Sequence, residues 1–377
     1  MKDLKECKIA IVADWLTSRG GAERVVLTLA NLFPQADIFT SVYRSEIFPE
    51  LANHQIKTSF LQTMPGGKKH QLWPHLRPLA FELLNLDDYQ IVISSASAEA
   101  KGVLTKPETL HICYCHTPTR YYWSHYHYYL NHPEFGIFNA GVKLILPFLI
   151  HKLRLWDRVA ADRVDVFIAN SCTTQQRIKK YYEHEAKVIY PPVDVDRFNI
   201  NQKTDDYFLI VGRQTAYKRT DLAIEAFNHL GLPLKVIGTG PALKKWMLKA
   251  KSNIEFLGRL SDREVARYLA NCRALIMPQE EDAGIVPLEA MASGRPVIAY
   301  RSGGATETVI DGITGIFFDQ QTVLSLVEAV KKFSGMTWQP TAIRQHALQF
   351  GINEFQQKIY KFVQQAYEEH LTLNNLS

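Results

Sequence analysis

Short apolar stretches recur along the chain, and segments with helical periodicity separate them. In the first half these stretches fall at residues 8–13, 37–40, 91–94, 110–115, 165–169 and 188–190. They are apolar without strict alternation, which is typical of strands buried on both faces of a parallel sheet. Strands that alternate with helices in this way predict a doubly wound α/β fold.

The same alternation resumes after residue 206 and divides the chain in two. The later stretches fall at residues 207–211, 234–237, 254–257, 274–277 and 297–300, each followed by glycine or proline. A chain of 377 residues exceeds one typical core. Prolines and polar residues lie between the two series, as in a linker. We therefore predict an α/β domain at 1–190, a linker at 191–206, a second α/β domain at 207–350 and a helical segment at 351–377.

Composition argues against several classes of protein, namely nucleic-acid binders, membrane-spanning proteins and secreted proteins. The net charge of +5 is modest and argues against a nucleic-acid binder. No apolar run approaches the ~18 residues of a membrane span, and the apolar run near the N-terminus is too short for a signal peptide. The five cysteines match no zinc or redox spacing, which favours a reducing compartment. We expect a cytoplasmic protein.

Residues 274–294 read as a strand, a loop and a helix. Gly284 allows the loop backbone to approach a ligand, Pro287 is expected to begin the helix, and Gly294 to end it. Glu281 then lies in the loop and Glu289 in the first helical turn. Helix N–H groups bind phosphate, and carboxylates accept hydrogen bonds from sugar hydroxyls. The alternative is a solvated loop acid plus an ordinary first-turn glutamate.

Two cations, Arg213 and Lys218, follow the strand at 207–211. An arginine fork and a lysine point charge at a strand end can clamp a diphosphate. A solvated basic loop is the alternative.

His116 follows the strand at 110–115, at the end where open α/β sheets bind ligands. An ordinary hydrogen-bonded histidine is the alternative. Gly20 and Gly21 precede a helical segment, which suits either phosphate approach or a simple tight turn. The tyrosines and histidines at 121–127 include no carboxylate partner, so we predict no metal site there.

Several of these runs together resemble the retaining glycosyltransferases of family GT4. They are Glu-x7-Glu at 281–289 continued by Ala-Met-Ala-Ser-Gly, Gly-Arg-x4-Lys at 212–218, and the N-terminal Gly-Gly-Ala-Glu at 20–23. Residues 115–123, Cys-His-Thr-Pro-x-Arg-Tyr-x-Trp, are similar to a subgroup that includes O-antigen mannosyltransferases. One departure is Asp282-Ala283-Gly284, where the family commonly has Gly-Phe-Gly.

The resemblance implies the GT-B fold, in which two Rossmann-like domains face each other across a cleft and a C-terminal helix, here 351–377, crosses back to the first domain. It implies catalytic roles for four residues: His116, Glu281, Arg213 and Lys218. It implies donor-binding roles for a larger set: Gly20, Gly21, Arg213, Lys218, Gly258, Arg259, Glu281, Ala283, Gly284, Ile285, Val286 and Glu289. Within that set, Glu281 would bind the sugar, Glu289 the ribose, and Gly258-Arg259 would lie near the base.

The implied reaction is retaining transfer of a hexose from a nucleotide diphosphate sugar to an acceptor hydroxyl, without a metal or further cofactor. GDP-mannose is the first expected donor and a UDP-hexose the alternative. The expected acceptor is a saccharide, lipid-linked, in surface polysaccharide synthesis. An epimerase or phosphorylase on the same architecture and a non-catalytic sugar-nucleotide-binding scaffold remain alternatives.

Two stretches mix basic and apolar side chains, and both lie in the first domain. Residues 66–77 contain Lys68, Lys69, Trp73 and Arg77, and residues 143–158 have the same character. Such segments can lie on anionic lipid, which would place the protein on the cytoplasmic face of a membrane. The alternative is a core-facing helix with a solvated basic side.

Overall fold

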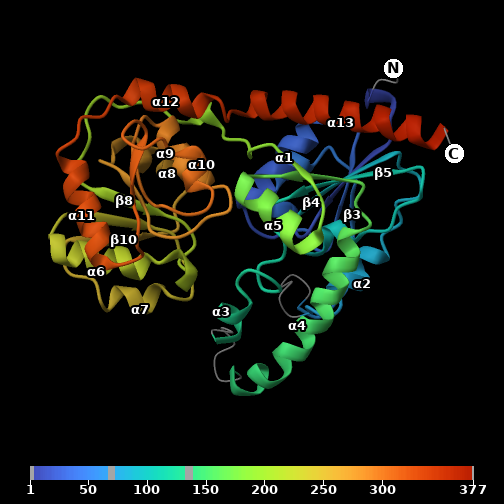
Figure 1. The fold of residues 1–377 in the computed structure, drawn as a ribbon, viewed down its shortest axis with the longest axis horizontal. Helices are drawn as coiled ribbons and strands as arrows, with labels where there is room; N and C mark the ends of the chain where they lie inside the picture. The colour runs from blue at the N-terminus through green and yellow to red at the C-terminus, as the bar shows by residue number, and fades with distance from the viewer. Residues whose placement is uncertain (1–3, 67–72, 132–138, 376–377) are drawn as a thin grey trace. The chain divides into compact units, whose positions relative to one another are not determined.

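The computed structural model describes residues 4–66, 73–131 and 139–375, and the chain forms two compact units. The first unit contains the chain up to Pro191 together with the residues from Phe355 onward, and the second runs from Pro192 to Glu354. Each unit is a parallel sheet flanked by helices (Figure 1).

The first unit is built on a seven-stranded parallel sheet in the order β3-β2-β1-β4-β5-β6-β7. The strands are β1 (Ile9–Ala13), β2 (Asp37–Thr40), β3 (Ile56–Thr58), β4 (Ile91–Ala96), β5 (Leu110–Cys115), β6 (Val166–Ala169) and β7 (Ala186–Val188). The helices are α1 (Gly21–Leu32), α2 (Arg77–Glu82), α3 (Tyr126–Asn131), α4 (Asn139–Ala161), α5 (Cys172–Tyr182) and α13 (Ile352–Asn375). The order reverses between β1 and β4, which is where doubly wound sheets open a ligand site.

The last helix shares the core of the first unit. Phe355, Ile359 and Val363 of α13 are buried in the same cluster as Ile9 and Ile11 of β1. Their spacing of four residues gives α13 one apolar face, which is the pattern of a helix packed on a sheet domain.

The second unit is built on a six-stranded parallel sheet in the order β10-β9-β8-β11-β12-β13. The strands are β8 (Phe208–Val211), β9 (Leu234–Ile237), β10 (Ile254–Gly258), β11 (Leu275–Met277), β12 (Val297–Tyr300) and β13 (Gly315–Phe318). The helices are α6 (Thr220–Leu230), α7 (Leu243–Met247), α8 (Asp262–Asn271), α9 (Ile285–Ala292), α10 (Ala305–Thr308), α11 (Val323–Ser334) and α12 (Pro340–Leu348). The predicted doubly wound fold class is therefore confirmed for both halves.

The segment predicted as a linker, residues 191–206, does not lie free of the domains. Val193 and Phe198 are fully buried in the core of the second unit, and the Arg344 guanidinium donates to the carbonyl oxygen of Phe198. Val195 also packs against this core, so several apolar side chains hold the segment there. Within the described ranges, no helix is both long and apolar enough to cross a bilayer.

Candidate active site

The loop after β11 leads directly into α9. Gly284 adopts φ +73°, and α9 begins at Ile285. Pro287 is therefore the third helical residue, not the first as predicted, and Glu289 lies in the second turn. The left-handed conformation that glycine tolerates lets the helix start two residues early. Gly294, at φ +71°, ends the helix as predicted.

The start of α9 presents backbone N–H groups without a side-chain cap. Gly284 is the N-cap and has no side chain to accept a hydrogen bond from the first turn. Ile285 and Val286 supply the first helical N–H groups, and the buried Ala283 precedes them. This arrangement suits an anion, because helix N-termini carry free donors and a partial positive charge.

Lys218 and Glu281 form an ion pair, although they come from different loops. Lys218 follows β8 and its Nζ donates to Glu281 Oε1, which also accepts from Gln279 Nε2 at 3.1 Å. Their side chains are 19% and 17% exposed. Both residues follow strands that are neighbours in the sheet, so the fold brings together a cation and a carboxylate predicted from separate motifs.

Arg213, the other predicted cation, is exposed at the start of the Lys218 loop and has no ion-pair partner in the part of the chain that the structure describes. The loop backbone packs closely against the turn after β9. A Cβ on Gly238 would lie 1.9 Å from the Gly212 carbonyl oxygen, and one on Gly240 would lie 2.2 Å from that of Gln214. These two glycines therefore fix the path of the loop that carries Arg213.

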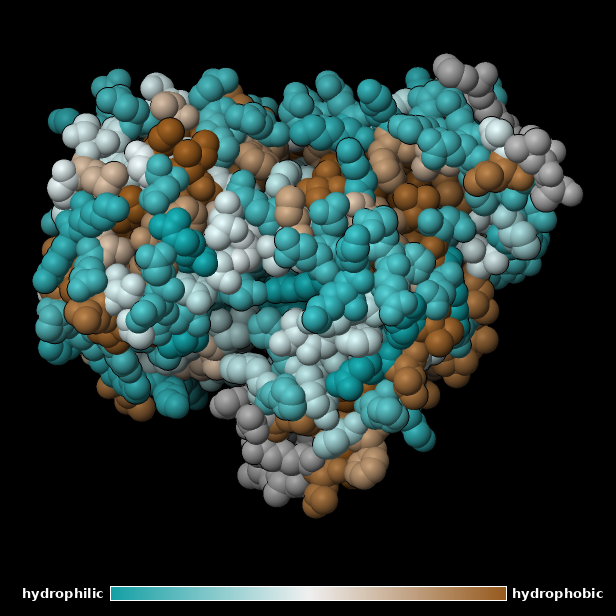
Figure 2. Space-filling model, in the orientation of Figure 1, coloured by the Kyte–Doolittle hydropathy of each residue, from teal (hydrophilic) through white to brown (hydrophobic). Residues whose placement is uncertain are grey.

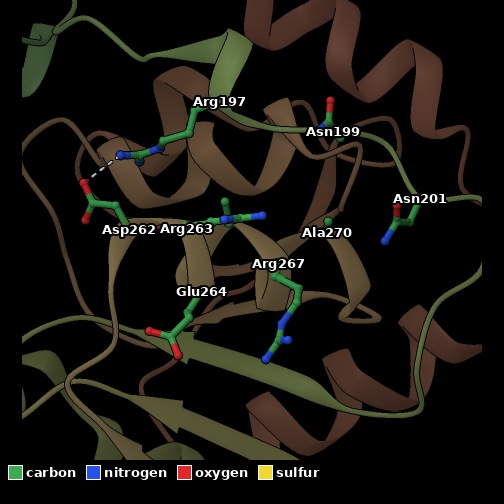
Figure 3. A pocket seen from close by; sticks show the side chains of 9 residues that line it. Arg197, Asn199, Asn201, Asp262, Arg263, Glu264, Arg267 and Ala270 are labelled. Atoms are coloured by element: carbon green, nitrogen blue, oxygen red, sulfur yellow. Dashed lines mark hydrogen bonds and ion pairs between the residues drawn. The ribbon is translucent and has the colours of Figure 1, made fainter.

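Glu289 is almost completely buried and its carboxylate is already paired. Arg197 Nη2 donates to Glu289 Oε1 at 2.9 Å. The other terminal nitrogen, Nη1, donates to Asp262 Oδ2 at 2.8 Å (Figure 3). Arg197 was not predicted from the sequence. It lies 92 positions before Glu289, and only the fold brings the two side chains together. A role for Glu289 toward ribose would have to be shared with this arginine.

Arg197 also lines a pocket of about 780 Å³ bounded by the 195–201 segment and α8. Arg263 and Arg267 project from α8 beside Asn199 and Asn201 (Figure 3). None of the predicted donor-binding residues lines this pocket, and Arg197 is its link to Glu289.

Gly258 and Arg259 lie at the end of β10. Gly258 adopts φ +67°, and its carbonyl oxygen accepts from the Gly238 N–H at 2.7 Å. Arg259 is exposed. Gly258 is therefore the last residue of the strand beside β9 and Arg259 follows it, at the same edge of the sheet as the Gly238 turn.

The remaining predicted residues belong to the first unit. His116 follows β5 and is 8% exposed, with its Nε2 2.8 Å from Ser95 Oγ and its ring 5.2 Å from that of Tyr114. Gly20 is the N-cap of α1 and Gly21 its first residue, again without a side-chain cap.

A cavity of about 120 Å³ opens beside these glycines, lined in part by Asp14, Glu23 and Ser95. Asp14 accepts N–H bonds from Ser97, Ala98 and Ala100 at 2.6–3.0 Å, yet burial and the charge of Glu99 raise its pKa to about 6. Burial, with the charge of Asp14, raises the pKa of Glu23 to about 7. Sequence reasoning did not single out this pair of acids.

The Glu23 carboxyl has a predictable effect on stability. Its pKa rises from an ordinary 4.5 to about 7 in the folded state, so the folded chain holds this proton more tightly than the unfolded chain. Stability therefore falls as pH rises through that window. We expect Glu23→Gln to raise Tm by about 2–4 °C at about pH 8 and to leave it unchanged at about pH 4. A thermal melt of both proteins at each pH would check this; an equal shift at both would contradict it.

Arg77 cannot make the membrane contact predicted for it. It is 6% exposed, and its Nη2 lies 3.2 Å from Glu99 Oε1 and 3.4 Å from the hydroxyl of Tyr121. Trp73 is half-buried and its Nε1 donates to Pro65 at 3.3 Å. Lys68 and Lys69 lie outside the described residues. The arginine is held inside because a buried carboxylate, Glu99, faces it.

Two family models match the chain. "Glycosyltransferase Family 4" matches residues 19–197, and "Glycosyl transferases group 1" matches residues 193–348. The first covers the loop at Gly20 and His116, and the second covers Arg213, Lys218, Glu281 and Glu289.

Relatives agree with these models. The chain is 25% identical to the alpha-1,3/1,6-mannosyltransferase ALG2 of Dictyostelium discoideum, over 88% of this chain and 90% of that protein. It is 30% identical to an uncharacterized glycosyltransferase of Methanocaldococcus jannaschii, over 58% of this chain and 63% of that protein. It is 26% identical to O-antigen chain mannosyltransferase C of Escherichia coli, over 45% of this chain and 51% of that protein.

Solved structures agree in fold. HepE of Anabaena, in complex with UDP and glucose, superposes with a TM-score of 0.69 at 18% identity, over 95% of this chain and all of that one. WaaG, a glycosyltransferase involved in lipopolysaccharide biosynthesis, gives 0.66 at 16% identity, over 94% and 99%. With both halves matched by glycosyltransferase models and this fold, the chain belongs to the GT4-family glycosyltransferases of the GT-B class.

Proposed function

We propose that the protein transfers a hexose, with retention, from a nucleotide diphosphate sugar to a hydroxyl group of a saccharide acceptor. The observation that carries this proposal is the Lys218–Glu281 pair at neighbouring strand ends, in the unit whose helix α9 begins with uncapped N–H groups. A leaving diphosphate needs cations and N–H dipoles where its charge develops, and a sugar needs hydrogen-bond acceptors. The nucleotide sugar is the co-substrate, and the proposal includes no metal or further cofactor.

Several predicted residues of the second unit take separate roles in this proposal. Arg213 and Lys218 hold the diphosphate, with the N–H groups of Gly284–Val286 beside them. Glu281 accepts hydrogen bonds from the sugar. Glu289, supported by Arg197, accepts from the ribose. The departing phosphate assists deprotonation of the acceptor in a front-face substitution, because no residue is placed as a covalent nucleophile by the motifs.

His116, Gly20 and Gly21 would act from the first unit. His116 is proposed to contact the donor sugar, and the glycines to lie near the phosphates. The imidazole is already oriented, because Ser95 Oγ lies 2.8 Å from its Nε2.

GDP-mannose is the first proposed donor, supported by the names of two relatives, ALG2 and O-antigen chain mannosyltransferase C. A UDP-hexose is the alternative, and HepE, solved with UDP and glucose, favours it. The proposed acceptor is a lipid-linked saccharide of surface polysaccharide synthesis, which would bring the protein to the cytoplasmic face of a membrane.

A thermal-shift comparison of GDP, UDP and ADP at equal concentration tests the donor. A ligand at ~100 times its Kd stabilises the native state by about 2.7 kcal/mol. We expect a shift with GDP and none with ADP. A shift with UDP alone would overturn GDP-mannose as donor. No shift with any nucleotide would contradict the transferase proposal and the sugar-nucleotide-binding scaffold alike.

Measuring nucleotide release distinguishes a transferase from a phosphorylase or an epimerase that would bind the diphosphate in the same way. We expect free nucleoside diphosphate from the nucleotide sugar only when an acceptor fraction is added. Release without acceptor, or conversion of the sugar while still attached to nucleotide, would favour a phosphorylase or an epimerase instead.

A further inference from the structure

Helix α4 turns an apolar side to solvent. Leu144, Ile145, Phe148, Leu155 and Val159 are 57–75% exposed. With 3.6 residues per turn these five positions fall on one side of the helix. We call them the apolar stripe. A contiguous exposed patch of this kind marks an interaction surface on a globular protein, whereas scattered apolar residues do not.

The inward side of α4 does not fit the alternative of a core-facing helix with a solvated basic side. In the structure Arg154 is half-buried, 4.6 Å from the ring centre of Tyr126, and its Nε donates to the carbonyl oxygen of Tyr122 at 2.6 Å. Ile150 and Leu153 fill a small cluster on the same side. The apolar residues left over face outward.

A second helix extends this surface. The Trp156 Nε1 of α4 donates to Glu82 Oε1 of α2 at 2.7 Å, so the two helices are joined. Helix α2 exposes Leu79, and Leu83, the residue directly after the helix, is exposed four positions later. Figure 2 shows apolar surface gathered where Figure 1 draws α2 and α4.

The polar side chains beside the apolar stripe are basic residues. Lys152 and His151 are exposed and lie midway along it, and residues 144–156 contain no aspartate or glutamate. The nearest exposed acid toward the helix end, Asp162, is bonded to Arg158 Nη1 at 2.5 Å. A lysine within an apolar face can lay its methylenes on hydrocarbon and reach lipid phosphate with its ammonium group.

A second copy of the chain fits this stripe poorly. If two α4 helices paired antiparallel about a two-fold axis, the midpoint of the stripe would lie on the axis. Lys152 would then face the same lysine of its partner in an apolar interface, and buried like charges are unfavourable. An anionic bilayer can accommodate both, because its acyl chains take up the apolar side chains and its phosphates pair with the lysine.

We propose that the apolar stripe of α4 docks on the surface of an anionic lipid bilayer. This inference extends the membrane contact proposed above and replaces Arg77 with residues that are exposed. The inner side of the same helix bonds the segment after His116: Asp157 accepts from Thr119 Oγ1 at 2.9 Å and from Trp123 Nε1 at 2.7 Å. Lipid docking would therefore hold the helix that positions this segment.

Flotation of the full chain with vesicles tests the proposal without any assay of transfer. The vesicles are phosphatidylcholine alone and an equimolar mixture with phosphatidylglycerol. The test variant is Phe148→Glu with Leu155→Glu. The matched control is Leu248→Glu with Leu324→Glu, two residues of the second unit that are 89% and 68% exposed. All four side chains are exposed, so circular dichroism should show folded proteins.

We expect the wild type to bind the anionic vesicles and the test variant to bind at least about tenfold more weakly, because two apolar anchors become carboxylates. The control should bind like the wild type. Lys152→Glu should weaken binding to the anionic vesicles more than to phosphatidylcholine. No binding by the wild type, or equal binding by the test variant, would overturn the proposal. So would a wild-type dimer in solution that the test variant abolishes. Failure here would leave the nucleotide shift intact, so the two proposals can fail separately.

Discussion

Glu281→Ala is expected to lower turnover of the nucleotide sugar by about a thousandfold while the thermal shift with the nucleoside diphosphate persists. Glu281 is proposed to meet the sugar and not the nucleotide, so its loss should affect the reacting part of the donor. The variant also removes the carboxylate to which Lys218 Nζ donates, so the ammonium loses this contact. Positioned charge contributes to catalysis because it needs no reorganisation as the reaction proceeds.

The matched control is Glu225→Ala. Glu225 accepts from Lys249 Nζ at 2.9 Å in the same unit, but that pair is nearly half exposed. The control removes the same side chain from the same kind of ion pair, and turnover should not change. Measured side by side, nucleotide release and thermal shift give two independent readouts. Full turnover in Glu281→Ala would contradict the assignment; loss of the nucleotide shift together with turnover would place Glu281 at the nucleotide instead.

Most of the fold could be predicted from sequence because buried parallel strands are continuous apolar runs. The strands at 37–40, 110–115, 234–237 and 297–300 match the structure residue for residue. β3 and β13 were missed. β3 (Ile56–Thr58) is a three-residue edge strand, half-buried throughout and without an apolar run. β13 (Gly315–Phe318) begins with a glycine and has an apolar run of only three residues.

The candidate site was predictable only as separate motifs. Spacing indicated Glu281 and Lys218, but nothing in the sequence indicates that residues 63 positions apart form an ion pair. The same holds for Arg197 and Glu289. Segment 143–158 shows a further limit: its periodicity indicated an amphipathic helix, but not which side faces solvent. That choice depended on where Arg154 and Asp157 find partners, which is a property of the folded chain.

Asp157→Ala is expected to destabilise the folded chain by about 3–5 kcal/mol, because it leaves a buried cation without its partner. Lys101 and Asp157 are 2% and 0% exposed, and Lys101 Nζ lies 2.5 Å from Asp157 Oδ1. Burial alone would lower the pKa of Lys101, but the charge and hydrogen bond of Asp157 outweigh it and raise that pKa. The carboxylate also accepts from Thr119, Trp123 and the Tyr182 hydroxyl, so alanine would leave those donors without it.

Comparing Lys101→Met with Asp157→Ala distinguishes the contribution of the cation from that of the carboxylate. Lys101→Met removes the cation but leaves Asp157 with its three neutral donors, whereas Asp157→Ala leaves Lys101 with the Ala98 carbonyl oxygen, 2.7 Å away. We therefore expect Asp157→Ala to cost more than Lys101→Met in urea unfolding followed by circular dichroism. Glu185→Ala is the control: its pair with Lys179 has side chains 80% and 69% exposed, and such surface pairs contribute about 0–1 kcal/mol. The opposite order, with Lys101→Met the more damaging change, would show that the carboxylate depends on its cation more than on the donors that surround it.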